Sequence, residues 1–229
     1  MSVIASNVQH IDDPLSDLSQ PHSMGTTIIA AVYADGVILG ADSRTSTGSY
    51  VANRASNKLT EVAPNIYCCR SGSAADTQAV SDTVRMHLGT LQMELGTQID
   101  VATAAKLFSL ICYSNKDKLM AGIIVAGCSD AEGPAVYNIP LGGSMHKLPY
   151  AVGGSGSTYV MGFCDANYRQ GMQKDECIEF VRRALSHAME RDGSSGGIMR
   201  TVVITKDGVQ REMLPLDKFA YVKTIPTYQ

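Results

Sequence analysis

The order in which strand-like and helix-like segments follow one another constrains the fold of this chain more than any other feature. Apolar, partly β-branched runs at 27–33 and 37–42 flank the pair Asp35-Gly36, the strongest short-range signal for a hairpin. Further strand-like runs then alternate with two pairs of helical segments. Because hairpin-linked strands pair antiparallel and the helices come in groups, the sequence predicts an α+β domain of layered antiparallel sheets.

Hydrophobic periodicity gives these elements approximate bounds. A helix is expected to start after Ser73, a good N-cap residue, because apolar residues then recur at a period near 3.6. Ideal pairing in the first hairpin places Thr26 opposite Thr45. The pattern does not fix which face of the sheet Asp42 takes, since one bulge would reverse it. The other helices are expected at 101–115, 157–169 and 175–191, and the other strands at 65–70, 121–127, 135–139, 150–152, 198–205 and 209–214, with a strand or loop at 49–59.

Composition excludes several classes of protein. The chain has 229 residues, 45% of them hydrophobic, and a formal charge of -3, which suit one globular domain or at most two small ones. A pI of about 5.9 argues against a nucleic-acid surface, and no apolar run is long enough to span a bilayer. The histidines show no metal-ligand spacing, so no zinc site is predicted. The cysteines lie mostly in apolar surroundings and form no Cys-x-x-Cys pair, so buried thiols are favoured over disulfides at positions 68, 69, 112, 128, 164 and 177.

The N-terminal segment ends at a Gly-Thr pair. The first 25 residues contain no Lys or Arg and no apolar stretch of signal-peptide length, so neither a secretory nor a mitochondrial signal fits. They are either a disordered tail or a propeptide. If the chain were cut after Gly25, Thr26 would carry a hydroxyl and a free α-amine, which form a nucleophile with its own base. The alternative is an ordinary loop that ends where the first strand begins.

Two glycine-rich stretches resemble other motifs without their context. Residues 193–197 match G-x-S-x-G, the nucleophile elbow of α/β-hydrolases and the competing enzyme interpretation. That motif needs a strand before it, a helix after it and a later histidine, whereas here a helix precedes, a strand follows, and no histidine comes after His187. Residues 153–157 lack the spacing of a nucleotide-binding loop.

Five separated motifs resemble those of a proteasome β subunit, in the same order and spacing. The resemblance extends from Gly25 to about residue 215. Within the family, residues 68–78 resemble the caspase-like subunit, which prefers acidic residues. The motifs are Gly25-Thr26-Thr27, Gly40-Ala41-Asp42-Ser43-Arg44 with Lys58 after it, Arg70-Ser71-Gly72-Ser73-Ala74-Ala75-Asp76, Gly154-Ser155-Gly156-Ser157 and Asp192-Gly193-Ser194-Ser195-Gly196-Gly197.

The resemblance implies a four-layer α-β-β-α sandwich of two antiparallel sheets, the N-terminal nucleophile hydrolase fold. It implies that residues 1–25 are a propeptide and that residues 26–229 are a catalytic domain, with a variable tail from about 215. Its implied partners are other β subunits in a seven-membered ring, an α-subunit ring and polypeptide substrates. Neither nucleic acid nor membrane is a partner, no cofactor is implied, and the cytoplasm and nucleus are the expected locations.

The resemblance also implies roles for individual residues. Thr26 becomes the nucleophile after self-cleavage of the Gly25-Thr26 bond, Lys58 lies near its hydroxyl, and Asp42 pairs with Lys58. Ser155, Asp192 and Ser195 hold the amine end of Thr26. The remaining roles concern the substrate. The N–H of Gly72 stabilises the oxyanion, and Arg70 selects an acidic residue before the scissile bond. The residues that bind the peptide are Thr45, Ser46, Gly72 and Ala74.

Each of these residues, taken alone, has an ordinary alternative. Asp42 and Arg44 could form a strand-end ion pair, and Lys58 could be a solvated surface lysine. The serines could belong to turns, Asp192 could be a cap, and Arg70 could face water. A competing function is a structural ring subunit that never matures. The presence of Gly25, Thr26, Asp42 and Lys58 together favours the active form.

Overall fold

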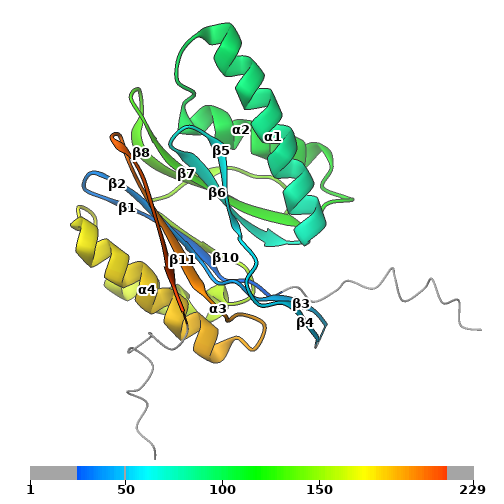
Figure 1. The fold of residues 1–229 in the computed structure, drawn as a ribbon, viewed down its shortest axis with the longest axis vertical. Helices are drawn as coiled ribbons and strands as arrows, with labels where there is room; N and C mark the ends of the chain where they lie inside the picture. Colours follow the sequence, from blue (N-terminus) through cyan, green and yellow to red (C-terminus); the bar gives the residue numbers. More distant parts are fainter. Residues whose placement is uncertain (1–24, 49, 216–229) are drawn as a thin grey trace, which may run out of the picture.

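The computed structural model describes residues 25–48 and 50–215, and within them it has four layers. Figure 1 shows two stacked sheets with one pair of helices on each outer side. One sheet has the strand order β10-β1-β2-β11-β12 and the other the order β5-β6-β7-β8-β9, with antiparallel pairing throughout. The predicted sandwich of two antiparallel sheets between helix layers is confirmed.

The elements have the following bounds. The first sheet consists of β1 (Ile28–Tyr33), β2 (Gly36–Ala41), β10 (Tyr150–Gly153), β11 (Met199–Thr205) and β12 (Gly208–Leu214). The second consists of β5 (Leu59–Ala63), β6 (Ile66–Gly72), β7 (Ala121–Ser129), β8 (Gly133–Ile139) and β9 (His146–Lys147). The helices are α1 (Ala74–Leu95), α2 (Val101–Ser114), α3 (Ser157–Asn167) and α4 (Lys174–Arg191), and a small hairpin is made of β3 (Thr45–Thr47) and β4 (Tyr50–Asn53).

Apolar side chains fill the three spaces between the four layers. Successive residues of β1 serve two of these cores, because Ile28 lies between the sheets whereas Ile29 lies under α3 and α4. A strand buried on both faces reads as a continuous apolar run, which is the pattern that residues 27–33 show. The third core lies between α1, α2 and the second sheet and contains the fully buried Phe108.

The register of the first hairpin differs from the prediction. Ile28 pairs with Ala41 and Tyr33 with Gly36, so the turn residues are Ala34 and Asp35 and Thr26 is not opposite Thr45. Gly36 is the first residue of β2, and the position requires glycine because a Cβ there would come within 2.1 Å of the Ile204 carbonyl oxygen on β11. The register moves by two residues, which leaves each side chain on its expected face.

Two smaller differences concern the strands, since the short β9 was not predicted and β6 is longer than expected. Residues 50–58, within the segment expected as a strand or loop, contain β4 and then a bend before β5. Strand β6 continues through Gly72, because residues 70–72 still pair with β7. The helix start after Ser73 is confirmed by the Asp76 backbone N–H, which donates to the Ser73 hydroxyl at 3.3 Å.

All six cysteines are buried free thiols, as predicted. Burial raises the pKa of Cys68 to about 11 and that of Cys164 to about 12, so both stay protonated at neutral pH. They behave as small apolar core residues. No helix within the described ranges is long and apolar enough to cross a membrane.

Candidate active site

Thr26 lies just before β1, where four other segments of the chain come close to it. Thr26 is only 4% exposed to solvent. The end of β2 brings Asp42 to it, and the residue that precedes β5 brings Lys58. The loop before α3 contributes Ser155, and the loop between α4 and β11 contributes Asp192, although these segments are far apart in sequence.

Lys58 contacts both the hydroxyl of Thr26 and the carboxylate of Asp42. Its Nζ is 3.0 Å from Thr26 Oγ1 and 2.7 Å from Asp42 Oδ1. The Thr26 hydroxyl donates to the Gly25 carbonyl oxygen at 2.7 Å, and Lys58 Nζ lies 3.4 Å from that same oxygen. Lys58 is 6% exposed, which overturns the alternative of a solvated surface lysine.

Burial changes the acidity of Lys58. Removal of its ammonium group from water lowers the pKa of Lys58 below the ordinary lysine value, and the negative charge of Asp42 opposes this shift only in part. The neutral amine is therefore more accessible near physiological pH than in a surface lysine. A neutral amine 3.0 Å from a hydroxyl can accept its proton.

Asp42 is fully buried, and both oxygens of its carboxylate accept hydrogen bonds. Oδ1 accepts from the Thr27 N–H at 2.9 Å as well as from Lys58. Oδ2 accepts from the backbone N–H groups of Arg44 at 3.1 Å and Gly196 at 3.0 Å. Asp42 thus pairs with Lys58 as expected, and not with the Arg44 guanidinium, which donates to the Gly193 carbonyl.

A chain of hydroxyls and one carboxylate holds the backbone nitrogen of Thr26. The Thr26 N–H donates to Ser155 Oγ at 3.1 Å, and Ser155 Oγ donates to Asp192 Oδ2 at 2.6 Å. Ser195 Oγ donates to the same oxygen at 2.6 Å and lies 2.7 Å from Thr27 Oγ1. Of the three residues expected to hold this nitrogen, Ser155 touches it directly, whereas Asp192 and Ser195 act through neighbours.

A cavity of about 60 Å³ opens beside Thr26. Gly72 lines it with a backbone φ of 99°, a left-handed conformation that favours glycine. A Cβ at this position would also approach the Met120 carbonyl oxygen to 2.3 Å. The lining contains the predicted residues Thr45, Arg70, Gly72 and Ala74, together with Gly25, Thr26, Ser56, Asn57, Lys58 and Thr77.

Arg70 borders this cavity with hydrogen-bonding capacity to spare. One terminal nitrogen donates to the Asn57 carbonyl oxygen at 2.9 Å. The Nε–H is buried and has no partner among the described residues. An unpaired buried donor is costly, and a carboxylate is the acceptor that best fits a guanidinium.

One predicted residue lies differently from the expectation, and the roles of three further residues were not predicted. Ser46 is buried in β3 and is not part of the cavity lining. Thr27 and Gly196 both bind Asp42, and Ser43 Oγ accepts from the Ile198 N–H at 2.7 Å. These residues belong to the motifs that the sequence singled out, but their roles depend on contacts between loops that no local pattern reveals.

Comparisons with known proteins agree with one another. A family model described as "Proteasome subunit" matches residues 22–204. The chain is 60% identical over 192 residues to "Proteasome subunit beta type-6" of Dictyostelium discoideum, covering 84% of this chain and 90% of the relative. It is 55% identical over 197 residues to "Proteasome subunit beta type-1" of Saccharomyces cerevisiae, covering 86% and 91%. It is 51% identical over 202 residues to "Proteasome subunit beta type-6" of Arabidopsis thaliana, covering 88% and 87%.

Proposed function

Because this chain belongs to the proteasome subunit family, and is a threonine endopeptidase subunit of the proteasome core, we propose that Thr26 is its nucleophile. We propose further that cleavage after Gly25 activates it and that it cuts polypeptides after acidic residues. The observation that carries this proposal is the buried contact of Lys58 Nζ with Thr26 Oγ1 at 3.0 Å and with Asp42 at 2.7 Å.

The contacts of the uncut chain support self-cleavage in which Lys58 is the base. The nitrogen of Thr26 is still an amide here and cannot accept a proton. Lys58 Nζ takes the proton from Thr26 Oγ1, which attacks the adjacent Gly25 carbonyl carbon and forms an ester as the amide C–N bond breaks. The Thr26 nitrogen takes a proton and becomes the α-amine, and water then hydrolyses the ester and releases the N-terminal segment as a carboxylate.

The same atoms serve a peptide substrate once the amine is free. Thr26 Oγ1 attacks the substrate carbonyl and passes its proton through the Lys58 and α-amine pair, whose amine has an unperturbed pKa near ~8. Ser155, supported by Asp192, fixes the amine through the contact that now holds the amide. The N–H of Gly72 stabilises the oxyanion, and the leaving amine takes the proton before water releases the acyl group.

Gly25→Ala is expected to slow self-cleavage by about 10²-fold, the typical effect of displacing a reacting group by ~1 Å. A Cβ at residue 25 would come within 1.9 Å of Ser194 Cβ and 2.3 Å of its carbonyl oxygen, which pushes the scissile carbonyl away from Thr26. The fraction of cleaved chain in assembling particles, followed by intact-mass analysis over time, measures this effect.

Gly162→Ala is the matched control, since a Cβ there meets open space on α3 and should leave cleavage unchanged. Incorporation of the Gly25→Ala chain into the particle, checked by native electrophoresis, separates a processing defect from a folding defect. Normal cleavage of the Gly25→Ala chain would contradict the proposed geometry at the scissile bond.

Arg70→Leu is expected to lower kcat/KM for a Glu-ended fluorogenic peptide by about 10- to 100-fold, the value of one charged hydrogen bond of ~1.5–3 kcal/mol. The reason is the guanidinium beside the cavity, with its unpartnered Nε–H. Turnover of a Leu-ended peptide should stay the same or rise. The measurement compares both peptides on the assembled particle.

The exposed Arg183→Leu, on α4 at the opposite side of the fold, is the control for loss of one positive charge. It should leave the preference unchanged. If Arg70→Leu kept the preference for the Glu-ended peptide, the proposal of post-acidic cleavage would be wrong, whereas the threonine mechanism would stand.

The wider setting follows from the same family. We propose that residues 1–25, of which 1–24 lie outside the described residues, are the propeptide, and that residues 26–229 form the catalytic domain. The tail from about 215 also lies almost entirely outside the described residues. The family implies assembly with other proteasome subunits in the core particle. A seven-membered β ring against an α ring, in the cytoplasm and nucleus, is the arrangement we propose.

A further inference from the structure

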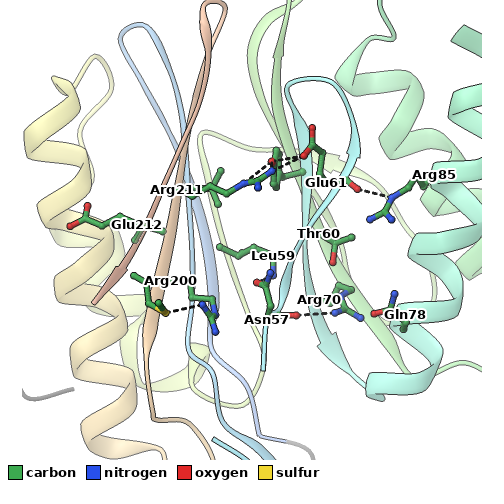
Figure 2. Close-up of a pocket in the computed structure, with 14 residues that line it drawn as sticks. Asn57, Leu59, Thr60, Glu61, Arg70, Gln78, Arg85, Arg200, Arg211 and Glu212 are labelled. Atoms are coloured by element: carbon green, nitrogen blue, oxygen red, sulfur yellow. Dashed lines mark hydrogen bonds and ion pairs between the residues drawn. The ribbon is translucent and has the colours of Figure 1, made fainter. Parts of the chain in front are cut away.

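A large arginine-lined cleft lies behind the candidate specificity residue, on one side of the sandwich. Its volume is about 610 Å³, and it runs between β5 and β6 of one sheet and β11 and β12 of the other. Four arginines line it: Arg70, Arg85, Arg200 and Arg211. Figure 2 shows Arg211 and Glu61 meeting at one end, whereas Arg200 and Arg70 flank Asn57 at the other. We use the name arginine cleft for this site.

Most of the positive charge in the arginine cleft is not neutralised by the described part of the chain. Only Arg211 has a carboxylate partner among the four, namely Glu61 at 2.7 Å. Arg85 instead donates to the Glu61 carbonyl oxygen at 2.9 Å. Arg200 donates to the carbonyl oxygens of Ala55 at 2.9 Å and Ser56 at 3.4 Å and to Met213 Sδ at 3.0 Å, none of which carries a negative charge. The second acid of the cleft, Glu212, is paired with Arg182, which does not line it.

This concentration of cations is not a general property of the surface, because the whole chain has a formal charge of -3. All the cleft cations are arginines, whose planar guanidinium groups bind carboxylates through two parallel hydrogen bonds. Arg85 uses only its Nε–H in the contact with Glu61, so its terminal nitrogens remain available as donors within the described residues. The electrostatics therefore favour an acidic occupant.

The walls of the arginine cleft favour an extended polypeptide as that occupant. Strands β5 and β12 are the edge strands of the two sheets within the described residues, and both border the cleft. An edge strand exposes unpaired N–H and C=O groups, which proteins commonly cover or pair with another segment. Met213 and Leu59 add apolar surface between the charged groups.

We propose that the arginine cleft receives an extended, acidic segment of an adjoining proteasome subunit. Carboxylates of that segment pair with Arg85 and Arg200 across the cleft, and its backbone lies along the edge of β5 or β12. Arg70 is not needed for this segment and is left to bind the substrate, because it also borders the cavity beside Thr26. The proposal rests on assembly with other subunits and not on the catalytic roles, so its failure would leave the proposed function unaffected.

Site-specific photo-crosslinking in the assembled core particle tests the occupant. A photoreactive residue replaces Met213, which lines the cleft and is 54% exposed. The expected product joins this chain to a net-acidic peptide of another proteasome subunit, identified by mass spectrometry. The same replacement at Met161, 44% exposed on α3, is the matched control and should not capture that peptide.

Charge reversal at Arg85 tests whether the positive charge of the arginine cleft attracts the acidic segment. Arg85→Glu is expected to lower the yield of the Met213 crosslink by about tenfold or more, because it places like charges together. Arg183→Glu, an exposed position on α4, should leave the yield unchanged. Capture of a neutral or basic segment, of this chain's own residues 216–229, or of no protein would overturn the proposal, as would an Arg85→Glu yield equal to that of the control.

Discussion

Thr26→Ala is expected to abolish hydrolysis of Glu-ended peptides by this subunit, with a loss of at least about 10³-fold, as is typical when a nucleophile is removed. The hydroxyl that Lys58 contacts at 3.0 Å is then missing, so neither self-cleavage nor peptide attack can begin. Intact-mass analysis should find the bond after Gly25 unbroken. Peptide hydrolysis is measured on particles in which only this subunit is altered.

Thr26→Ser is the matched control, because serine keeps both the hydroxyl and, after cleavage, the α-amine. It should mature and retain measurable activity. Folding should survive the alanine variant as well, because Thr26 is not part of the three apolar cores and, among the described residues, its hydroxyl contacts only the Gly25 carbonyl oxygen and Lys58. Persistence of post-acidic hydrolysis after Thr26→Ala would show that another group is the nucleophile. An unaltered subunit that keeps its N-terminal segment in the particle would indicate the structural, non-maturing role.

Lys58→Ala is expected to block self-cleavage and, in a chain produced to begin at Thr26, to reduce peptide hydrolysis by about 10²- to 10⁴-fold, the usual contribution of a general base. The variant leaves Asp42 without its cation. The carboxylate nevertheless keeps three backbone donors, from Thr27, Arg44 and Gly196, so the chain should still fold and assemble. Native electrophoresis of the particle checks assembly, and intact mass and peptide turnover check function.

Lys58→Arg separates the proton acceptor from the positive charge. Arginine keeps the charge beside Asp42 but does not lose its proton at accessible pH, so it should be as inactive in self-cleavage as the alanine variant. Rescue by arginine would mean that Lys58 acts only through its charge. A normal rate in Lys58→Ala would remove Lys58 from the mechanism altogether.

The pH dependence of self-cleavage in the unaltered chain provides an independent check. The reactive form of Lys58 is the neutral amine, so the rate should rise with pH up to the pKa of Lys58 and then level off. Burial lowers that pKa, so the rise should end below the pH at which an ordinary lysine titrates. Rates followed by intact mass between about pH 6 and 9 test this direction. A rate that falls with rising pH would contradict the base role.

Much of the architecture was determined by local sequence. Asp35 and Gly36 predicted a hairpin, and the apolar, partly β-branched run that follows Thr26 predicted a strand, which the structure buries on both faces. Ser73 marked the start of α1. These predictions succeed because turn chemistry, capping and hydrophobic periodicity act over a few residues, and the motifs around the site could be recognised for the same reason.

Only the tertiary structure decided how the site works. Lone residues such as Lys58 and Asp192 have ordinary surface roles in most proteins, and only their burial shows otherwise. Ser155 reaches the nitrogen of Thr26 from 129 positions away, because the strand order of the first sheet places β10 beside β1. The register of the first hairpin likewise became visible only in the structure, where Gly36 pairs with Tyr33 on one side and with Thr205 of β11 on the other. Pairing between distant strands depends on packing across the whole sandwich. Local sequence therefore identifies the reactive side chains of the site, whereas the fold determines the distances between them and the pKa of Lys58.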